Sequence, residues 1–80
     1  MPTISIIRGI IILMHLTNKE HNPPHIHAIY GEYEATFYIN DGLLYEGFFP
    51  KAESKIVKRF VNIHSKELLK MWETGIYKKL

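Results

Sequence analysis

Three histidines lie close together around a pair of prolines, in the segment His21-Asn22-Pro23-Pro24-His25-Ile26-His27. Imidazole titrates near neutral pH, so such side chains can transfer protons or, when neutral, bind a metal. The spacing of His21 and His25 matches two ligands one helical turn apart, but the two prolines between them forbid that helix. On a strand, His25 and His27 would share one face.

Two chemistries fit this cluster, and a purely structural role competes with both. His25 and His27 on a strand, with His21 on the adjoining loop, could bind zinc or another divalent metal. Without a metal, one imidazole could take a proton and another give one, cleaving RNA through attack by its own 2′-hydroxyl. No cofactor is then required. Alternatively, the histidines pack a small second core.

Length and composition indicate a single domain covering residues 1–80. Eighty residues lie near the lower limit for a self-supporting core, and 46% hydrophobic and 22% charged residues are ordinary for a globular protein. The chain has no cysteine, which excludes disulfides and thiolate metal sites and fits a reducing cytoplasm. The apolar segment 4–16 is shorter than the roughly 20 residues of a membrane span. We therefore expect a cytoplasmic protein with no membrane part.

The order of apolar segments and turn residues predicts strands followed by helices. Six isoleucines in residues 4–16 predict one buried strand. Residues 25–30, 33–39 and 43–48 predict three more strands, joined by a type II′ turn at Gly31-Glu32 and a three-residue loop at Asn40-Asp41-Gly42. Apolar side chains at helical spacing predict a helix from about residue 51, and Ser65 is the expected N-cap of a second. The predicted fold class is α+β: a four-stranded antiparallel meander (ββββαα) with two C-terminal helices on one face.

Turn geometry fixes which side chains are neighbours. The first turn places His25 opposite Tyr38 and His27 opposite Thr36. The second places Ile39 opposite Leu43, Phe37 opposite Tyr45 and Thr36 opposite Glu46. The face expected under the helices contains Ile26, Ala28, Ala35, Phe37, Ile39, Leu43 and Tyr45. The face expected to be uncovered contains His25, His27, Glu34, Thr36, Tyr38, Glu46 and Phe48. The candidate catalytic residues are His25 and His27 for proton transfer, oriented by Glu46 and Tyr38.

Charge is divided unevenly along the chain. Residues 1–50 carry two basic and five acidic side chains, whereas residues 51–80 carry eight basic and three acidic ones. The basic C-terminal part could attract RNA or an acidic protein, or it could be the solvated face of a surface helix. An uncovered sheet face would also suit a homodimer or a bound partner.

Several segments carry a family resemblance: Met1-Pro2-Thr3-Ile4 at the start, His21 to Ala28 with Tyr30-Gly31, the pair Glu46-Gly47, and His64 with Glu67-Leu68 and Trp72. Together they resemble a family of small bacterial proteins catalogued as a domain of unknown function and linked to DhiT-type toxins of type II toxin–antitoxin modules. The resemblance implies a toxin neutralised by a small cognate antitoxin-like protein, and acid–base cleavage of RNA is the activity we expect. The alternative is a non-enzymatic protein-interaction module, with or without a histidine-bound metal.

Overall fold

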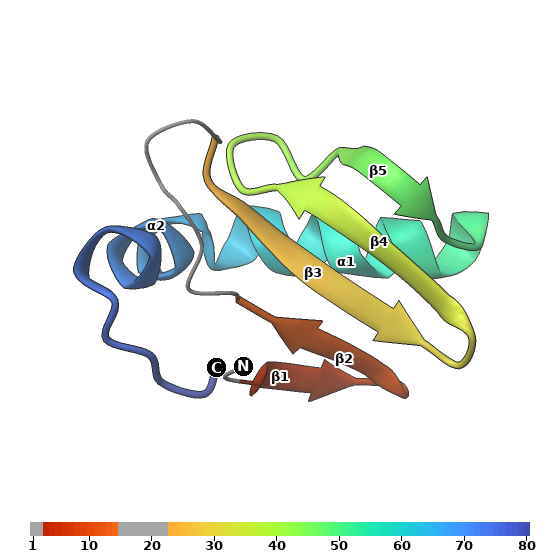
Figure 1. Cartoon of the computed structure of the whole chain (residues 1–80), viewed down its shortest axis with the longest axis horizontal. Helices are drawn as coiled ribbons and strands as arrows, with labels where there is room; N and C mark the ends of the chain where they lie inside the picture. The colour runs from red at the N-terminus through yellow and green to blue at the C-terminus, as the bar shows by residue number, and fades with distance from the viewer. Residues whose placement is uncertain (1–2, 15–22) are drawn as a thin grey trace.

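The computed structural model describes residues 3–14 and 23–80, in which an antiparallel sheet is followed by two helices (Figure 1). The strands are β1 (Thr3–Ile7), β2 (Ile10–Leu13), β3 (His25–Tyr30), β4 (Tyr33–Tyr38) and β5 (Leu44–Phe48), arranged in chain order. The helices are α1 (Lys51–Ile63) and α2 (Ser65–Thr74). The predicted α+β meander with two C-terminal helices is confirmed, although the sheet has five strands rather than four. Within the described residues, neither helix is long and apolar enough to cross a membrane.

The fifth strand arises because the segment expected to be one long strand folds back on itself. Arg8 and Gly9 form the two-residue turn between β1 and β2, with φ angles of 49° and 82°. A hairpin turn with positive φ at both positions is a type I′ turn. The run of isoleucines concealed this turn, because Arg8 is the only charged residue in residues 4–13 and no asparagine, aspartate or proline marks the turn.

The register of β3 and β4 is confirmed. Tyr30 lies opposite Tyr33, His27 opposite Thr36 and His25 opposite Tyr38. Gly31 has a φ of 60°, the conformation that a type II′ turn requires at its first central position. The histidine positions therefore follow from one glycine.

The loop between β4 and β5 is longer than predicted. Ile39 is fully buried and donates its backbone N–H to the carbonyl of Pro24, so it does not pair with Leu43. Instead, the Tyr38 N–H donates to the Leu43 carbonyl. The longer loop shifts the register by one residue, so that Phe37 pairs with Leu44. A β-bulge beside Tyr45 restores the predicted register, and Thr36 pairs with Glu46 as predicted. The predicted pairs Ile39–Leu43 and Phe37–Tyr45 are wrong.

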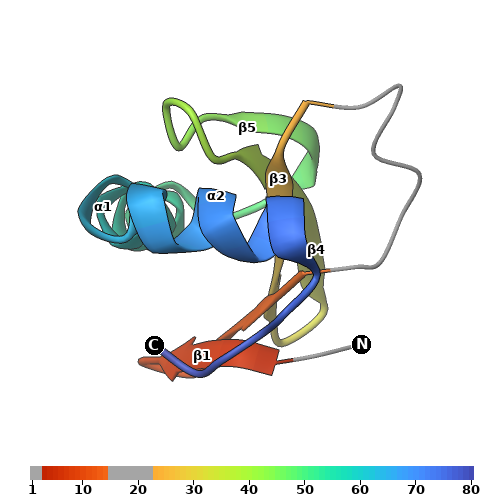
Figure 2. The same ribbon diagram turned by 90° about the vertical axis from the view of Figure 1, so that its left-hand side faces the viewer.

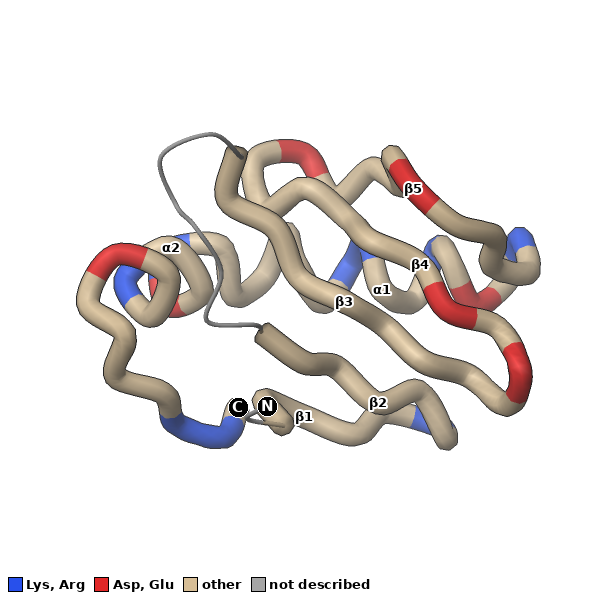
Figure 3. The backbone as a smooth tube through the Cα atoms, viewed as in Figure 1, with Lys and Arg blue, Asp and Glu red and all other residues tan. Residues whose placement is uncertain are grey.

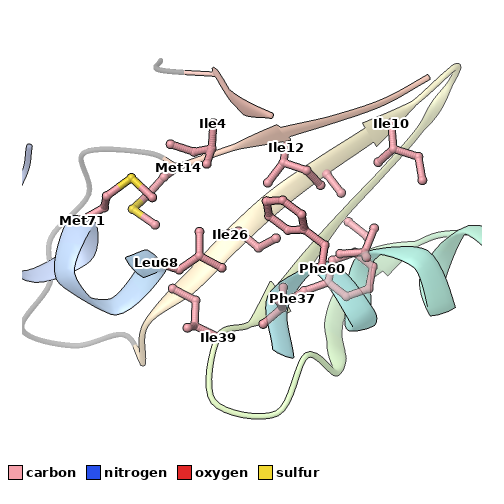
Figure 4. Packing of buried hydrophobic residues seen from close by; sticks show 14 of the residues in the cluster. Ile4, Ile10, Ile12, Met14, Ile26, Phe37, Ile39, Phe60, Leu68 and Met71 are labelled. Atoms are coloured by element: carbon pink, nitrogen blue, oxygen red, sulfur yellow. The ribbon is translucent and has the colours of Figure 1, made fainter. Parts of the chain in front are cut away.

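The helices cover one face of the sheet and close a single apolar core (Figure 4). Val57, Phe60 and Val61 of α1 are buried, and Leu68 and Met71 of α2 extend this surface. Ser65 is the first residue of α2, and the position before it is held by His64. The predicted N-cap is therefore wrong by one residue, because the His64 backbone also closes α1 by donating its N–H to Phe60.

The C-terminal tail returns from α2 to β1, where the Leu80 N–H donates to the carbonyl of Ile4 at 2.8 Å (Figure 1). Gly75 ends α2 in the left-handed conformation. The tail contains one unusual group: the buried hydroxyl oxygen of Tyr77 has no hydrogen-bond partner among the described residues. Burying a hydroxyl without a partner costs free energy.

Replacing Tyr77 with phenylalanine should therefore leave the free energy of unfolding unchanged or raise it by up to about 1 kcal/mol. Burial also raises the pKa of the Tyr77 hydroxyl. The folded state then holds this proton more tightly, so its contribution to stability is present below pH 10 and is lost as pH rises further. Urea unfolding at pH 7 and at pH 10.5 measures both effects. A Tyr77→Phe protein that loses as much stability between the two pH values as the wild type contradicts the second.

Candidate functional site

The ring of His25 is held by its neighbours on both sides. Its Nδ1 lies 2.9 Å from the carbonyl oxygen of Pro23, which can only accept, so Nδ1 carries a proton and donates it. Nε2 is left for a second interaction. The ring of Trp72 lies 4.8 Å from that of His25, centroid to centroid, and only 4% of His25 is exposed.

This burial corrects the prediction that His25 lies on an uncovered face. The helix α2 does not lie along the sheet but passes the end at which β3 begins, as two perpendicular views show (Figures 1 and 2). Trp72, near the end of α2, therefore reaches the first residue of β3 as well as the core. The helical spacing of Trp72 with Leu68 predicts a core position, but it does not show where α2 passes relative to the sheet.

His27 lies beside His25 and is half-buried. The two rings are 5.2 Å apart in an edge-to-face arrangement. The Nδ1 of His27 shares a hydrogen bond of 3.2 Å with the hydroxyl of Thr36, itself a buried residue. The predicted neighbourhood of two imidazoles and a hydroxyl is therefore present, with His25 as its inner member and His27 as its outer one.

Two tyrosines complete the cluster at the surface. Tyr38 and Tyr45 stack with centroids 4.2 Å apart and planes 12° from parallel, and Tyr45 lies 6.1 Å from His25. Tyr45 was expected under the helices, but the bulge turns it to the histidine side and leaves 37% of it exposed. Sequence patterns did not place Tyr45 here, because the bulge accompanies the register shift made by the longer β4–β5 loop. We call His27, Tyr38 and Tyr45, with His25 behind them, the histidine–tyrosine face.

Glu46 lies opposite Thr36 on the exposed strand β5. In the described part of the chain its carboxylate forms no hydrogen bond or ion pair, so its predicted orienting role stays a prediction. Its charge does affect Tyr45. The pKa of the Tyr45 hydroxyl is raised mainly by partial burial, next by the Glu46 carboxylate and least by Tyr38. Tyr45 is therefore a hydrogen-bond donor at neutral pH.

The metal hypothesis falls partly outside the described residues, because His21 lies there. Among residues 3–14 and 23–80, no three histidine, cysteine or acidic side chains are grouped closely enough to hold a metal ion. The predicted site formed by His21, His25 and His27 therefore stays a prediction. Any such site would have to use Nε2 of His25, since Nδ1 donates to Pro23.

The charges around this face are negative. Residues 23–50 contain four acidic side chains, all exposed, and no lysine or arginine. Figure 3 shows these acidic segments on the β4–β5 side of the sheet, while most basic segments belong to the helices and the tail. One surface hollow is lined by Lys55, Lys58 and Arg59 of α1, and its lining includes neither histidine.

Comparisons with known proteins agree with one part of the resemblance. A family model described as a domain of unknown function (DUF4160) matches residues 9–73, which includes the histidine segment, the whole of α1 and most of α2. No curated protein and no solved structure matches the chain.

Proposed function

The chain belongs to the domain-of-unknown-function family DUF4160, and we propose that it is a protein-interaction module whose histidine–tyrosine face binds a small partner protein. In this proposal the chain is the toxin component of a type II toxin–antitoxin module, and the partner is its cognate antitoxin-like protein. The observation that carries the proposal is the stacked pair of Tyr38, which is half-buried, and Tyr45, which is exposed. The pair lies beside the histidines, and the charged side chains of residues 23–50 are acidic rather than basic.

Tyrosine rings at a surface favour protein recognition for a physical reason. Each ring offers a large, rigid apolar area and a hydroxyl at its tip, and only two side-chain torsions must be fixed on binding. His27 adds a polar group that Thr36 already holds in one orientation. Little side-chain conformational entropy would therefore be lost when a partner covers this face.

The test combines growth and rescue. Induced expression should inhibit growth, and co-expression of the protein encoded beside it should restore growth. Tyr45→Lys should abolish the rescue, because a charged chain replaces a contact ring. Ile63→Lys is the matched control, since Ile63 is an exposed apolar residue of α1 and lies away from this face. Rescue of Tyr45→Lys as complete as that of the control would overturn the proposal.

Acid–base cleavage of RNA is the second candidate, and it rests on the fixed geometry of the two imidazoles. The proton of His25 is placed on Nδ1, and His27 is oriented by Thr36 within 5.2 Å of it, centroid to centroid. Two ordered imidazoles are the arrangement that general acid–base catalysis needs. This candidate ranks second because the surrounding carboxylates would repel the RNA phosphates.

His27→Ala separates the two functions, because His27 is half-buried and its loss should leave the circular dichroism spectrum unchanged. An RNA-cleaving enzyme should lose at least 100-fold of its cleavage rate, since a proton-transfer group contributes about 10²–10⁴-fold. Tyr45→Lys should then leave cleavage intact or improve it, because it adds positive charge. A binding module should instead show no cleavage in the wild type and keep most of its partner affinity in His27→Ala.

Metal content distinguishes a binding module that holds a metal from one that does not. We expect well below one zinc atom per chain in protein purified without a histidine tag, because His25 is buried against Trp72 and residues 3–14 and 23–80 contain no group of three metal-ligating side chains. Elemental analysis by mass spectrometry measures this. One zinc per chain, lost in His27→Ala, would instead support the three-histidine site that includes His21.

A further inference from the structure

We propose that β5 is a docking edge, to which the partner adds an extended segment of alternating basic and apolar residues as a sixth strand. This rests on the proposed function, because the segment belongs to the partner that binds the histidine–tyrosine face. The two surfaces are continuous, since Tyr45 belongs both to that face and to β5.

The two edges of the sheet differ in what covers them. At β1 the C-terminal tail approaches, and Leu80 donates its N–H to the carbonyl of Ile4. At β5 the described residues provide no further strand, and none of residues 44–48 bonds its backbone to a loop or helix end. An edge strand in this condition presents a row of unpaired N–H and C=O groups, which is the template that strand addition uses.

The side chains of β5 leave this template unprotected. All five residues are exposed, and Phe48 exposes 68% of its surface. Natural edge strands usually discourage pairing with lysine or proline. β5 has neither, and Glu46 is its only charged residue. Its β-bulge lies beside Tyr45 and leaves residues 46–48 in one continuous register with β4. Its neighbour Leu43 is also an exposed apolar residue, so the edge offers apolar contacts as well as unpaired backbone groups.

Charge indicates what kind of strand would bind. Glu32, Glu34, Asp41 and Glu46 are exposed and belong to segments on the β4–β5 side of the sheet (Figure 3). None of their carboxylates forms an ion pair with the described residues. A segment carrying lysine or arginine between its apolar residues would neutralise them. A second copy of this chain would not, because two-fold pairing of β5 with itself brings the same acidic edge together twice. The geometry therefore favours a different, basic partner.

Three ten-residue peptides test the mode of binding on the full chain. The first alternates valine with lysine, the second alternates valine with glutamate, and the third is the lysine peptide with N-methyl groups along one backbone edge. Amide chemical shifts should change on β5 with the lysine peptide, and the other two should bind at least tenfold more weakly. Binding of either control peptide as tight as that of the lysine peptide, shifts confined to other elements, or no binding of the lysine peptide at millimolar concentration would overturn the inference. So would a dimer that forms without peptide.

A matched pair of variants locates the site and separates this inference from the proposed function. Phe48 on β5 and Ile6 on β1 are 68% and 66% exposed, each on an edge strand. Phe48→Lys should weaken the lysine peptide and the partner at least tenfold, whereas Ile6→Lys should change neither by more than twofold. If the partner binds Phe48→Lys as tightly as the wild type but no longer binds Tyr45→Lys, the inference of a docking edge is wrong and the proposed function stands. If neither variant affects the partner, both fail.

Discussion

Gly47→Ala should destabilise the protein by about 3 kcal/mol, because the strand that forms the docking edge passes too close to its neighbour for any side chain. Gly47 has a φ of 89°, and a Cβ added there would collide with the backbone carbonyl oxygen of Glu34 and lie 2.9 Å from the Cα of Ala35. The left-handed conformation alone costs an L-residue about 1–2 kcal/mol. Forcing backbone apart adds about 1–3 kcal/mol.

Gly75→Ala is the control for this prediction. Gly75 also has a positive φ, of 74°, but an added Cβ would meet nothing within 4 Å. Its cost should therefore be the conformational part only, about 1 kcal/mol. Urea unfolding followed by circular dichroism gives both values. A domain of this size is stabilised by roughly 4–12 kcal/mol, so the difference is easily measured. Equal losses in the two variants would mean that β4 and β5 can separate at Gly47.

Local turn chemistry determined how much of the fold could be predicted. Gly31 with Glu32 specifies one turn type, so the register of β3 and β4, and with it the pairing of His25 and His27, followed from sequence. The β4–β5 loop did not, because the backbone of Ile39 could either pair with Leu43 or form its hydrogen bond elsewhere. Its bond to Pro24 depends on a contact between distant segments.

The sequence predicted which residues pair in the candidate site better than it predicted their burial and the face on which they lie. His27 and Thr36 are neighbours because strand pairing makes them so. The burial of His25 could not be predicted, since it depends on where α2 passes relative to the sheet. Tyr45 was placed on the wrong face because a bulge adds one residue without changing the later pairs. Alternation along a strand therefore fails wherever tertiary contacts insert a residue.

The position of Trp72 leads to the second large effect: Trp72→Ala should cost about 3–5 kcal/mol, the usual loss when a buried tryptophan is truncated. Trp72 is 95% buried, belongs to the apolar core and stands against His25. The substitution should therefore do more than leave a cavity. It should open His25 to solvent at the same time.

Two measurements on this variant separate packing from its effect on the site. Urea unfolding gives the stability, and the Nδ1–H signal of His25 in proton NMR reports whether water reaches the ring. Trp72→Phe keeps an aromatic ring at the same place, so it should lose less than half as much stability and retain the signal. In Trp72→Ala the signal should broaden under conditions where the protein remains folded. A sharp His25 signal in that variant would show that the ring is shielded by something other than α2. The histidine pair would then owe its arrangement to the sheet and the Pro23 carbonyl alone.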